Sequence, residues 1–68
     1  MRINSFRIHA QLARQNMTQT ELAKRAGTTR QAMSTLIRRG SCEPRTAGKI
    51  AAALNIDVEE LIIKEVVS

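Results

Sequence analysis

Residues 18–37 read TQTELAKRAGTTRQAMSTLI, and this stretch predicts two short amphipathic helices joined by a sharp turn. Thr18 and Glu21 have the spacing of a capping box, in which each side chain satisfies a free backbone N–H, so a helix is predicted to begin there. Gly27 stands where that helix must end, because glycine adopts a positive φ without a steric cost. Thr28 then forms the linker, and Thr29 is a good N-cap for a second helix over about residues 30–39.

The inner faces of the two predicted helices are apolar. In the first helix, apolar residues recur at helical spacing at Leu22, Ala23 and Ala26. Ala23 is small, which would let the second helix cross closely. In the second helix, the side chains expected to face the core are Ala32, Met33 and Leu36. Ile37 falls at the boundary between the two faces of that helix.

The opposite side of the second predicted helix is polar. At roughly 100° per residue, an arc of about 140° holds Arg30, Gln31, Ser34, Thr35 and Arg38. This arc contains no acid and no large apolar residue. Arginine, glutamine and hydroxyl side chains hydrogen-bond the edges of bases in the major groove. An ordinary solvated surface explains most single polar helix faces. Here the caps, the glycine turn and the apolar pattern occur together, which favours binding to double-stranded DNA.

With these residues, the chain resembles the lambda-repressor-like, Cro and XRE-type helix-turn-helix regulators. Members of that family carry a small residue at the position of Ala23, glycine at Gly27, and apolar residues at Met33 and Leu36. Residues 27–31, GTTRQ, are especially similar to small lambdoid phage repressors. The resemblance covers about residues 5–63. It implies an all-α, compact five-helix lambda-repressor-like domain in which the second and third helices form the helix-turn-helix.

The resemblance also implies roles for individual side chains. The expected base-reading residues are Thr29, Arg30, Gln31, Ser34 and Thr35. Thr29 would lie at the edge of the groove, and the family uses the positions of Ser34 and Arg38 variably. The expected phosphate-contacting residues are Gln19, Arg38, Arg39 and Arg45. Gln19 would also brace the recognition helix. Arg45 is included because a helix N-terminus favours anions; the alternative is a merely exposed arginine.

Two positions depart from the pattern of the family. Members often have glycine three residues after the leucine at Leu36, where this chain has Arg39, and glycine follows at Gly40. Many members carry an acid directly after that leucine, paired with an arginine of the first helix. The corresponding residues here are Ile37 and Leu12. We therefore expect an apolar contact in place of a buried ion pair, a replacement that is often neutral or favourable for stability.

Three more helices are predicted around this pair. The first spans about residues 4–15, and its apolar stripes leave open whether the core receives Ile8 and Leu12 or Phe6, Ala10 and Ala13. Asn16 is expected to end it in a left-handed conformation, before Met17 packs inward. After Pro44, a helix is expected from Arg45 or Thr46. Its apolar face consists of Ala47, Ile50, Ala51 and Leu54.

Asn55 is expected to end that helix, and Asp57 and Glu60 form a second capping box that opens a last helix at about Val58. Its expected core residues are Leu61 and Ile62. The tail, residues 62–68, is rich in β-branched side chains. Either the helix continues and buries them, or they form a homodimer contact by helix packing or strand pairing, or the end is frayed. Of these, we favour the dimer contact.

Length and charge fit one small DNA-binding domain over residues 1–68. A chain of 68 residues buries only about 60% of its unfolded surface, which leaves no room for a deep catalytic cavity. The net charge is +5 and unevenly placed. Residues 1–56 hold ten basic and two acidic side chains, whereas residues 57–68 hold one lysine and four acids. The positive part suits a polyanion, and the negative end would point away from it.

Several functional classes are disfavoured by composition. Cys42 is the single cysteine, so no internal disulfide is possible, and a reducing cytoplasm fits. One histidine and one cysteine cannot build a zinc cluster or most nucleophile–histidine–acid sets, so we expect no enzyme, no metal and no cofactor. His9 is expected on a helix surface. No apolar run approaches the roughly 20 residues of a membrane span, and no secretory signal is expected.

The functional hypothesis is a cytoplasmic, nucleoid-associated transcriptional repressor of the phage or mobile-element type. It would occupy an operator as a homodimer and read two half-sites about 34 Å apart in a near-palindromic sequence. Two alternatives stay open. The chain could be an antitoxin that binds a protein partner as well as DNA, or a protein-interaction module that has lost DNA binding.

Overall fold

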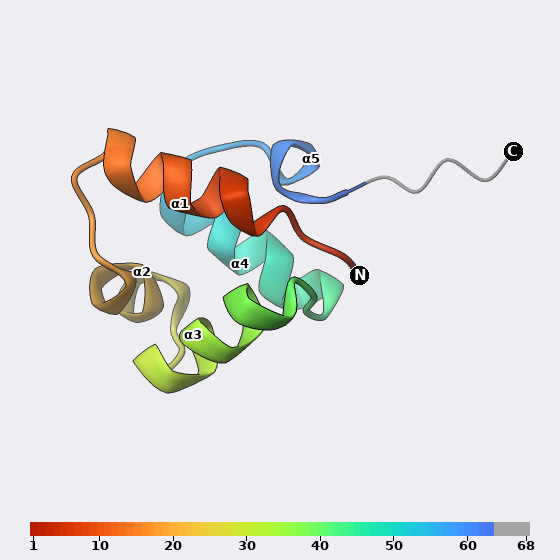
Figure 1. Cartoon of the computed structure of the whole chain (residues 1–68), viewed down its shortest axis with the longest axis horizontal. Coiled ribbons are helices and arrows are strands. Elements are labelled where there is room, and N and C mark those ends of the chain that lie inside the picture. The colour runs from red at the N-terminus through yellow and green to blue at the C-terminus, as the bar shows by residue number, and fades with distance from the viewer. Residues whose placement is uncertain (64–68) are drawn as a thin grey trace, which may run out of the picture.

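The computed structural model describes residues 1–63, which form five helices. These are α1 (Ser5–Arg14), α2 (Gln19–Ala26), α3 (Arg30–Arg39), α4 (Pro44–Leu54) and α5 (Val58–Leu61). In the view of Figure 1, α1 lies above and α3 below α4, and the two helices also contact each other. Helix α2 packs against α3 and α4, while α5 packs against α4 and α1. The all-α prediction is confirmed, and the helix-turn-helix pair is α2 and α3.

Local sequence signals set most helix boundaries. The side chains of Asn4, Thr18 and Thr29 each accept a hydrogen bond from the backbone N–H three residues later, at 3.1 Å. These bonds satisfy donors that a helix N-terminus leaves free. At the other end of α2, Gly27 has a φ of 74°, the left-handed conformation that the sequence predicted. Asn16 also has a positive φ, of 54°, as predicted for the residues that end α1.

The two capping boxes form only in part. Glu21 accepts a hydrogen bond from the Thr18 hydroxyl at 3.5 Å, and its carboxylate does not reach back to the Thr18 backbone. At the second box, Asp57 accepts from the backbone N–H of Glu59 at 2.9 Å rather than from that of Glu60. The predicted start of α5 at Val58 is nevertheless right, because one acceptor at the N-cap is sufficient to begin the helix.

Helix α4 begins one residue earlier than the sequence predicted. Pro44 is its first residue, whereas a start at Arg45 or Thr46 was expected. Proline suits this position because the N–H that it lacks would have no partner in the first turn, and its fixed φ is already helical. Glu43 is the N-cap and makes no side-chain capping bond. Arg45 therefore lies within the first turn of α4 rather than before it.

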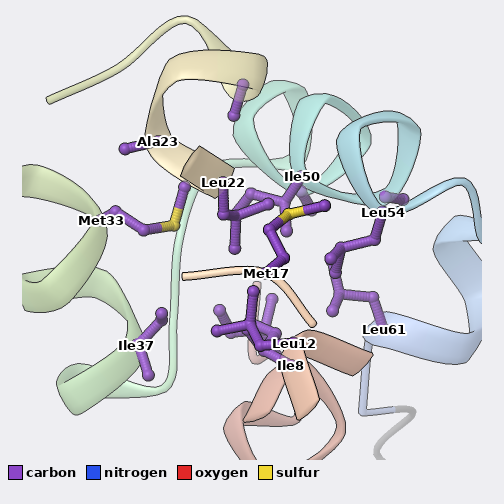
Figure 2. Close-up of a cluster of buried hydrophobic side chains, with 14 residues drawn as sticks. Ile8, Leu12, Met17, Leu22, Ala23, Met33, Ile37, Ile50, Leu54 and Leu61 are labelled. Atoms are coloured by element: carbon purple, nitrogen blue, oxygen red, sulfur yellow. The ribbon is translucent and has the colours of Figure 1, made fainter. Parts of the chain in front are cut away.

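The core is aliphatic. Buried side chains come from all five helices and from the segments before α1 and α2; they are Ile3, Ile8, Leu12, Met17, Leu22, Ala23, Ala26, Met33, Ile37, Ala47, Ile50, Ala51, Leu54 and Leu61. Figure 2 shows Met33 of α3 directed toward the cluster around Leu22 and Met17. In α1, the buried stripe is Ile8 with Leu12. The other stripe faces solvent, and Phe6 is 84% exposed.

The first three residues form an extended segment that the sequence did not reveal. Its backbone lies between residues 40–42 and residues 61–63, with antiparallel bridges that join Arg2 to Ser41 and Ile3 to Ile62. The Ile3 N–H donates to the carbonyl of Gly40 at 2.9 Å, and the Ile63 N–H donates to the carbonyl of Arg2 at 3.0 Å. This pairing buries Ile3 and ties both ends of the described chain to the exit of α3.

The end of α5 settles part of the open question about the tail. Helix α5 stops at Leu61, and Ile62 is extended and half-buried instead of continuing the helix. Ile62 packs against the core as expected, although only in part, but the expectation that it belongs to the helix was wrong, because it is extended and pairs with Ile3. Residues 64–68 of the predicted dimerisation tail lie outside the described residues. None of the helices within residues 1–63 combines the length and apolar character that crossing a bilayer requires.

Candidate nucleic-acid interface

The turn between α2 and α3 is fixed by backbone hydrogen bonds. The N–H of Thr28 donates to the carbonyl of Ala23 at 2.9 Å, across the left-handed Gly27. This is the arrangement that satisfies the last carbonyls of a helix when the chain reverses direction. Leu22, Ala23 and Ala26 are buried as predicted, so α2 lies closely against α3. The turn and this packing together set the crossing of the two helices.

The rotation of α3 about its own axis differs from the sequence prediction. Met33 and Ile37 are the buried pair of this helix. Ala32, which was expected to face the core, is exposed, and Leu36 is only half-buried. Ile37 buries more apolar area than alanine does, so the i, i+4 pair of large side chains decides which face turns inward. At 100° per residue, the centre of the exposed face moves by roughly 70°, toward Ala32 and Arg39.

The exposed face of α3 has a shallow hollow of about 440 Å³. Its lining residues are Thr29, Gln31, Ala32, Thr35, Leu36 and Arg39. Three of these are predicted base-reading residues, and Arg39 was expected to contact phosphate. Arg30 and Ser34, also predicted to read bases, lie outside the hollow; Arg30 is exposed and Ser34 is half-buried. Ala32, which the sequence analysis assigned to the core, lies on the surface, and Leu36 packs against the core on one side and lines the hollow on the other.

The predicted phosphate-contacting residues lie at three helix ends. Gln19 is the first residue of α2 and is half-buried. Arg38 and Arg39 occupy the last turn of α3 and are exposed, as is Arg45 in the first turn of α4. Arg39 also lines a second hollow with Pro44 and Thr46 of α4. Its side chain therefore stands between the exposed face of α3 and the N-terminus of α4.

The C-terminal end of α3 is held by the beginning of the chain. The Ser5 hydroxyl donates to the carbonyl of Ile37 at 2.5 Å, and the Ile3 N–H binds the carbonyl of Gly40. Gly40 ends α3 with a φ of 70°. Residues 3–5 thus position the helix that carries the candidate site, and sequence reasoning missed them. The signal available was Ser5 itself, a hydroxyl residue in the first turn of α1.

The departure of Ile37 and Leu12 from the family pattern is explained by their burial. Both side chains belong to one hydrophobic cluster, as expected for an apolar substitute for an ion pair. Within residues 1–63 no buried side-chain nitrogen or oxygen lacks a hydrogen-bond partner. Removing the ion pair has thus left no uncompensated polar group in the described core.

Cys42 provides a test of the local environment next to this interface. Its side chain is half-buried, and desolvation raises the pKa of the thiol, an effect that outweighs the opposing charge of the N-terminal amino group. A raised pKa leaves less thiolate at a given pH, and the thiolate is the reactive form. We expect iodoacetamide at pH 8 to alkylate Cys42 more slowly in the folded protein than in the urea-unfolded chain, measured by mass spectrometry. A faster reaction in the folded protein would show that its thiolate is stabilised.

Residues 1–63 offer no group of three or more histidine, cysteine, aspartate or glutamate side chains that could hold a metal ion. His9 is exposed on α1. The described surface near α3 therefore carries hydrogen-bonding and basic side chains around the apolar side chains of Ala32 and Leu36.

Comparison with known proteins agrees with this arrangement. A family model described as a Cro/C1-type HTH DNA-binding domain matches residues 7–65, close to the range of the resemblance seen in the sequence. Neither a curated protein nor a solved structure matches the chain. The matched range contains α2, the turn and α3 in full, and it covers most of the 68 residues. The chain therefore belongs to the family of Cro/C1-type helix-turn-helix DNA-binding domains and is a DNA-binding transcriptional regulator.

Proposed function

We propose that this protein is a sequence-specific repressor of the phage or mobile-element type that acts by occupying its operator. The observation that carries the proposal is the exposed face of α3, where Gln31, Thr35 and Arg39 surround one hollow. No residue of α3 is acidic, so nothing on this helix repels the phosphate backbone. A helix with this surface fits the major groove, where glutamine and arginine side chains distinguish base pairs.

Within this proposal, base contacts come from the exposed face of α3, and phosphate contacts come from the ends of α2, α3 and α4. Gln31 and Thr35 read bases from the middle of the exposed face, with Thr29 at its edge and Arg30 and Ser34 on its flank. Phosphates are bound by Gln19, Arg38 and Arg45, and by Arg39, which also lines the hollow and can reach a base from there. Such contacts fix the register of the protein on the duplex, and base contacts supply the sequence preference. A cytoplasmic, nucleoid-associated location follows from this role.

We further propose that the protein binds as a homodimer. Support comes from an apolar surface beside the exit of α3, where Met1 is 49% exposed and Ile63 is 41% exposed. These two residues line one shallow hollow with Ile62 and Arg2. Exposed apolar patches commonly mark contacts between proteins. In a homodimer that binds an operator, both copies of α3 must meet the same side of the duplex at half-sites about 34 Å apart.

Selection of bound sites from a random double-stranded library at about 0.15 M salt tests this function. At that ionic strength, weak binding to phosphates is largely screened. We expect a near-palindrome with half-sites one helical turn apart. Recovery of a single half-site would contradict the homodimer, and recovery of no enriched sequence would contradict operator binding. The latter result would favour an antitoxin with a protein partner, or an interaction module, and co-purification would then identify the partner.

Arg45→Ala tests the phosphate set. We expect the variant to bind all duplexes more weakly, and the slope of log K against log salt to fall by about one unit, because one phosphate contact is lost. The slope can be measured by fluorescence anisotropy at several salt concentrations. Arg7→Ala is the matched control, since Arg7 lies on α1 in a separate hollow beside Asn55 and Glu60. An unchanged slope for Arg45→Ala would remove Arg45 from the phosphate set.

A further inference from the structure

The exposed face of α3 contains an apolar strip between its hydrogen-bonding side chains. Ala32 is exposed, and Leu36, one turn later, is half-buried. Both line the hollow that also contains Gln31 and Arg39. Leu36 packs against the core and also lines this hollow, so its position is fixed from behind. The strip follows from the rotation of α3 that buries Met33 and Ile37.

The threonines of this hollow are less polar than their sequence suggests. The Thr35 hydroxyl donates to the backbone carbonyl of Gln31 at 2.9 Å. The Thr29 hydroxyl accepts the N–H of Ala32 at 3.1 Å. The only donor of the Thr35 side chain is therefore used within its own helix. A binding partner can contact only its methyl group and its oxygen lone pairs. The Thr29 hydroxyl acts only as an acceptor in its bond and keeps its O–H, so the side-chain donors of the lining that remain for a partner belong to Thr29, Gln31 and Arg39.

An apolar spot of this size has a specific counterpart in the major groove. Thymine carries a 5-methyl group there, and alanine and threonine methyl groups make apolar contacts with it. No other base presents an apolar group at that edge. We propose that Ala32, Thr35 and Leu36 form a subsite for the methyl group of one thymine in each half-site, flanked by hydrogen bonds from Gln31 and Arg39. This inference rests on the proposed function and adds to it a base that the polar residues alone do not specify.

Deoxyuridine gives a direct test, because it lacks only the 5-methyl group of thymidine. The probe is the duplex recovered from the random library, with its thymines replaced by deoxyuridine one position at a time. We expect one position in each half-site to weaken binding by about fourfold, the effect of leaving one methyl-sized apolar group unburied. The other positions should change binding by less than about twofold. Dissociation constants are compared at one fixed salt concentration.

Ala32→Ser assigns the effect to this subsite. The variant keeps a small side chain and replaces the methyl group by a polar hydroxymethyl group. We expect the ratio of the dissociation constants for the thymidine and deoxyuridine duplexes to approach one at the sensitive position. Ala10→Ser is the matched control, because Ala10 is exposed on α1 and is not among the residues that line the hollow on α3. It carries the same helix-propensity cost and should leave the fourfold ratio unchanged.

The outcomes separate this inference from the function on which it rests. If a duplex binds tightly and no thymine position responds to deoxyuridine, the methyl subsite is wrong and the repressor function stands. If one position responds and Ala32→Ser leaves the ratio at fourfold, the methyl effect arises elsewhere, including in the shape of the DNA, and the subsite is again wrong. If no duplex is enriched, the proposed function fails and the subsite fails with it.

Discussion

Leu54→Ala is expected to lower the free energy of unfolding by about 2–5 kcal/mol, the cost of a truncated leucine in a close-packed core. Leu54 is fully buried in the last turn of α4, which packs against both α2 and α5. A small domain has a total stability of only about 5–15 kcal/mol, so this loss would remove a large part of it. Urea unfolding followed by far-ultraviolet circular dichroism measures the change.

Phe6→Ala is the matched control for this substitution. It removes a larger apolar side chain, but Phe6 is 84% exposed, so the stability should change by less than about 0.5 kcal/mol. A comparable loss in both variants would show that Phe6 is covered in solution. A Leu54→Ala protein that unfolds at the same urea concentration as the parent would contradict the burial of Leu54. The pair therefore tests burial rather than side-chain size.

The sequence predicted the helix-turn-helix well because its signals are local. Thr29 caps α3, and Gly27 adopts a positive φ, since each responds to neighbours within a few residues. The apolar spacing of α4 predicted its buried face correctly because Ala47, Ile50, Ala51 and Leu54 recur at helical spacing and fall on one side. In each case the physical cause operates within one or two helical turns. Helix caps and apolar spacing of this kind can therefore be predicted from the local sequence alone.

Features that depend on distant parts of the chain were not predictable in this way. Two stripes of α1 have the same spacing, and only packing against the other helices decides that Ile8 is buried and Phe6 exposed. Ile3 becomes a core residue because its segment lies between residues 40–42 and 61–63. No periodicity in a segment of three residues could indicate this. Such pairing depends on where α3 and α5 end, which only the assembled fold determines.

The candidate site was predicted in its residue types but not in its orientation. Gln31 and Thr35 line the hollow, as a base-reading role requires, and Arg39 joins them from the set assigned to phosphates. Ala32 was misplaced because helical spacing alone allows the inner face to be centred on either Ala32 or Ile37. The choice is made by the larger apolar area that Ile37 buries. A rotation of this size changes which side chains meet the bases and leaves the helix boundaries untouched.

Gln31→Ala is expected to cost about 1–3 kcal/mol in binding to the preferred duplex and to relax the preference at one base pair. Gln31 is exposed in the N-terminal half of α3 and lines the hollow. A glutamine amide can donate to N7 and accept from the N6 amino group of the same adenine, and alanine can do neither. Dissociation constants for the preferred duplex and for duplexes changed at one base pair at a time measure the effect.

The comparison of duplexes distinguishes a lost base contact from a disturbed helix. Thr35 bonds to the backbone carbonyl of Gln31, which the substitution retains, and alanine favours the helix at least as strongly as glutamine does. The shape of α3 should therefore survive, and the loss should vanish on the one duplex whose base pair at that position is already changed. Equal weakening on every duplex would mean that Gln31 contacts the backbone of the DNA. Sequence preference would then have to arise from Arg39 and the apolar strip, so this variant decides which part of the exposed face of α3 does the reading.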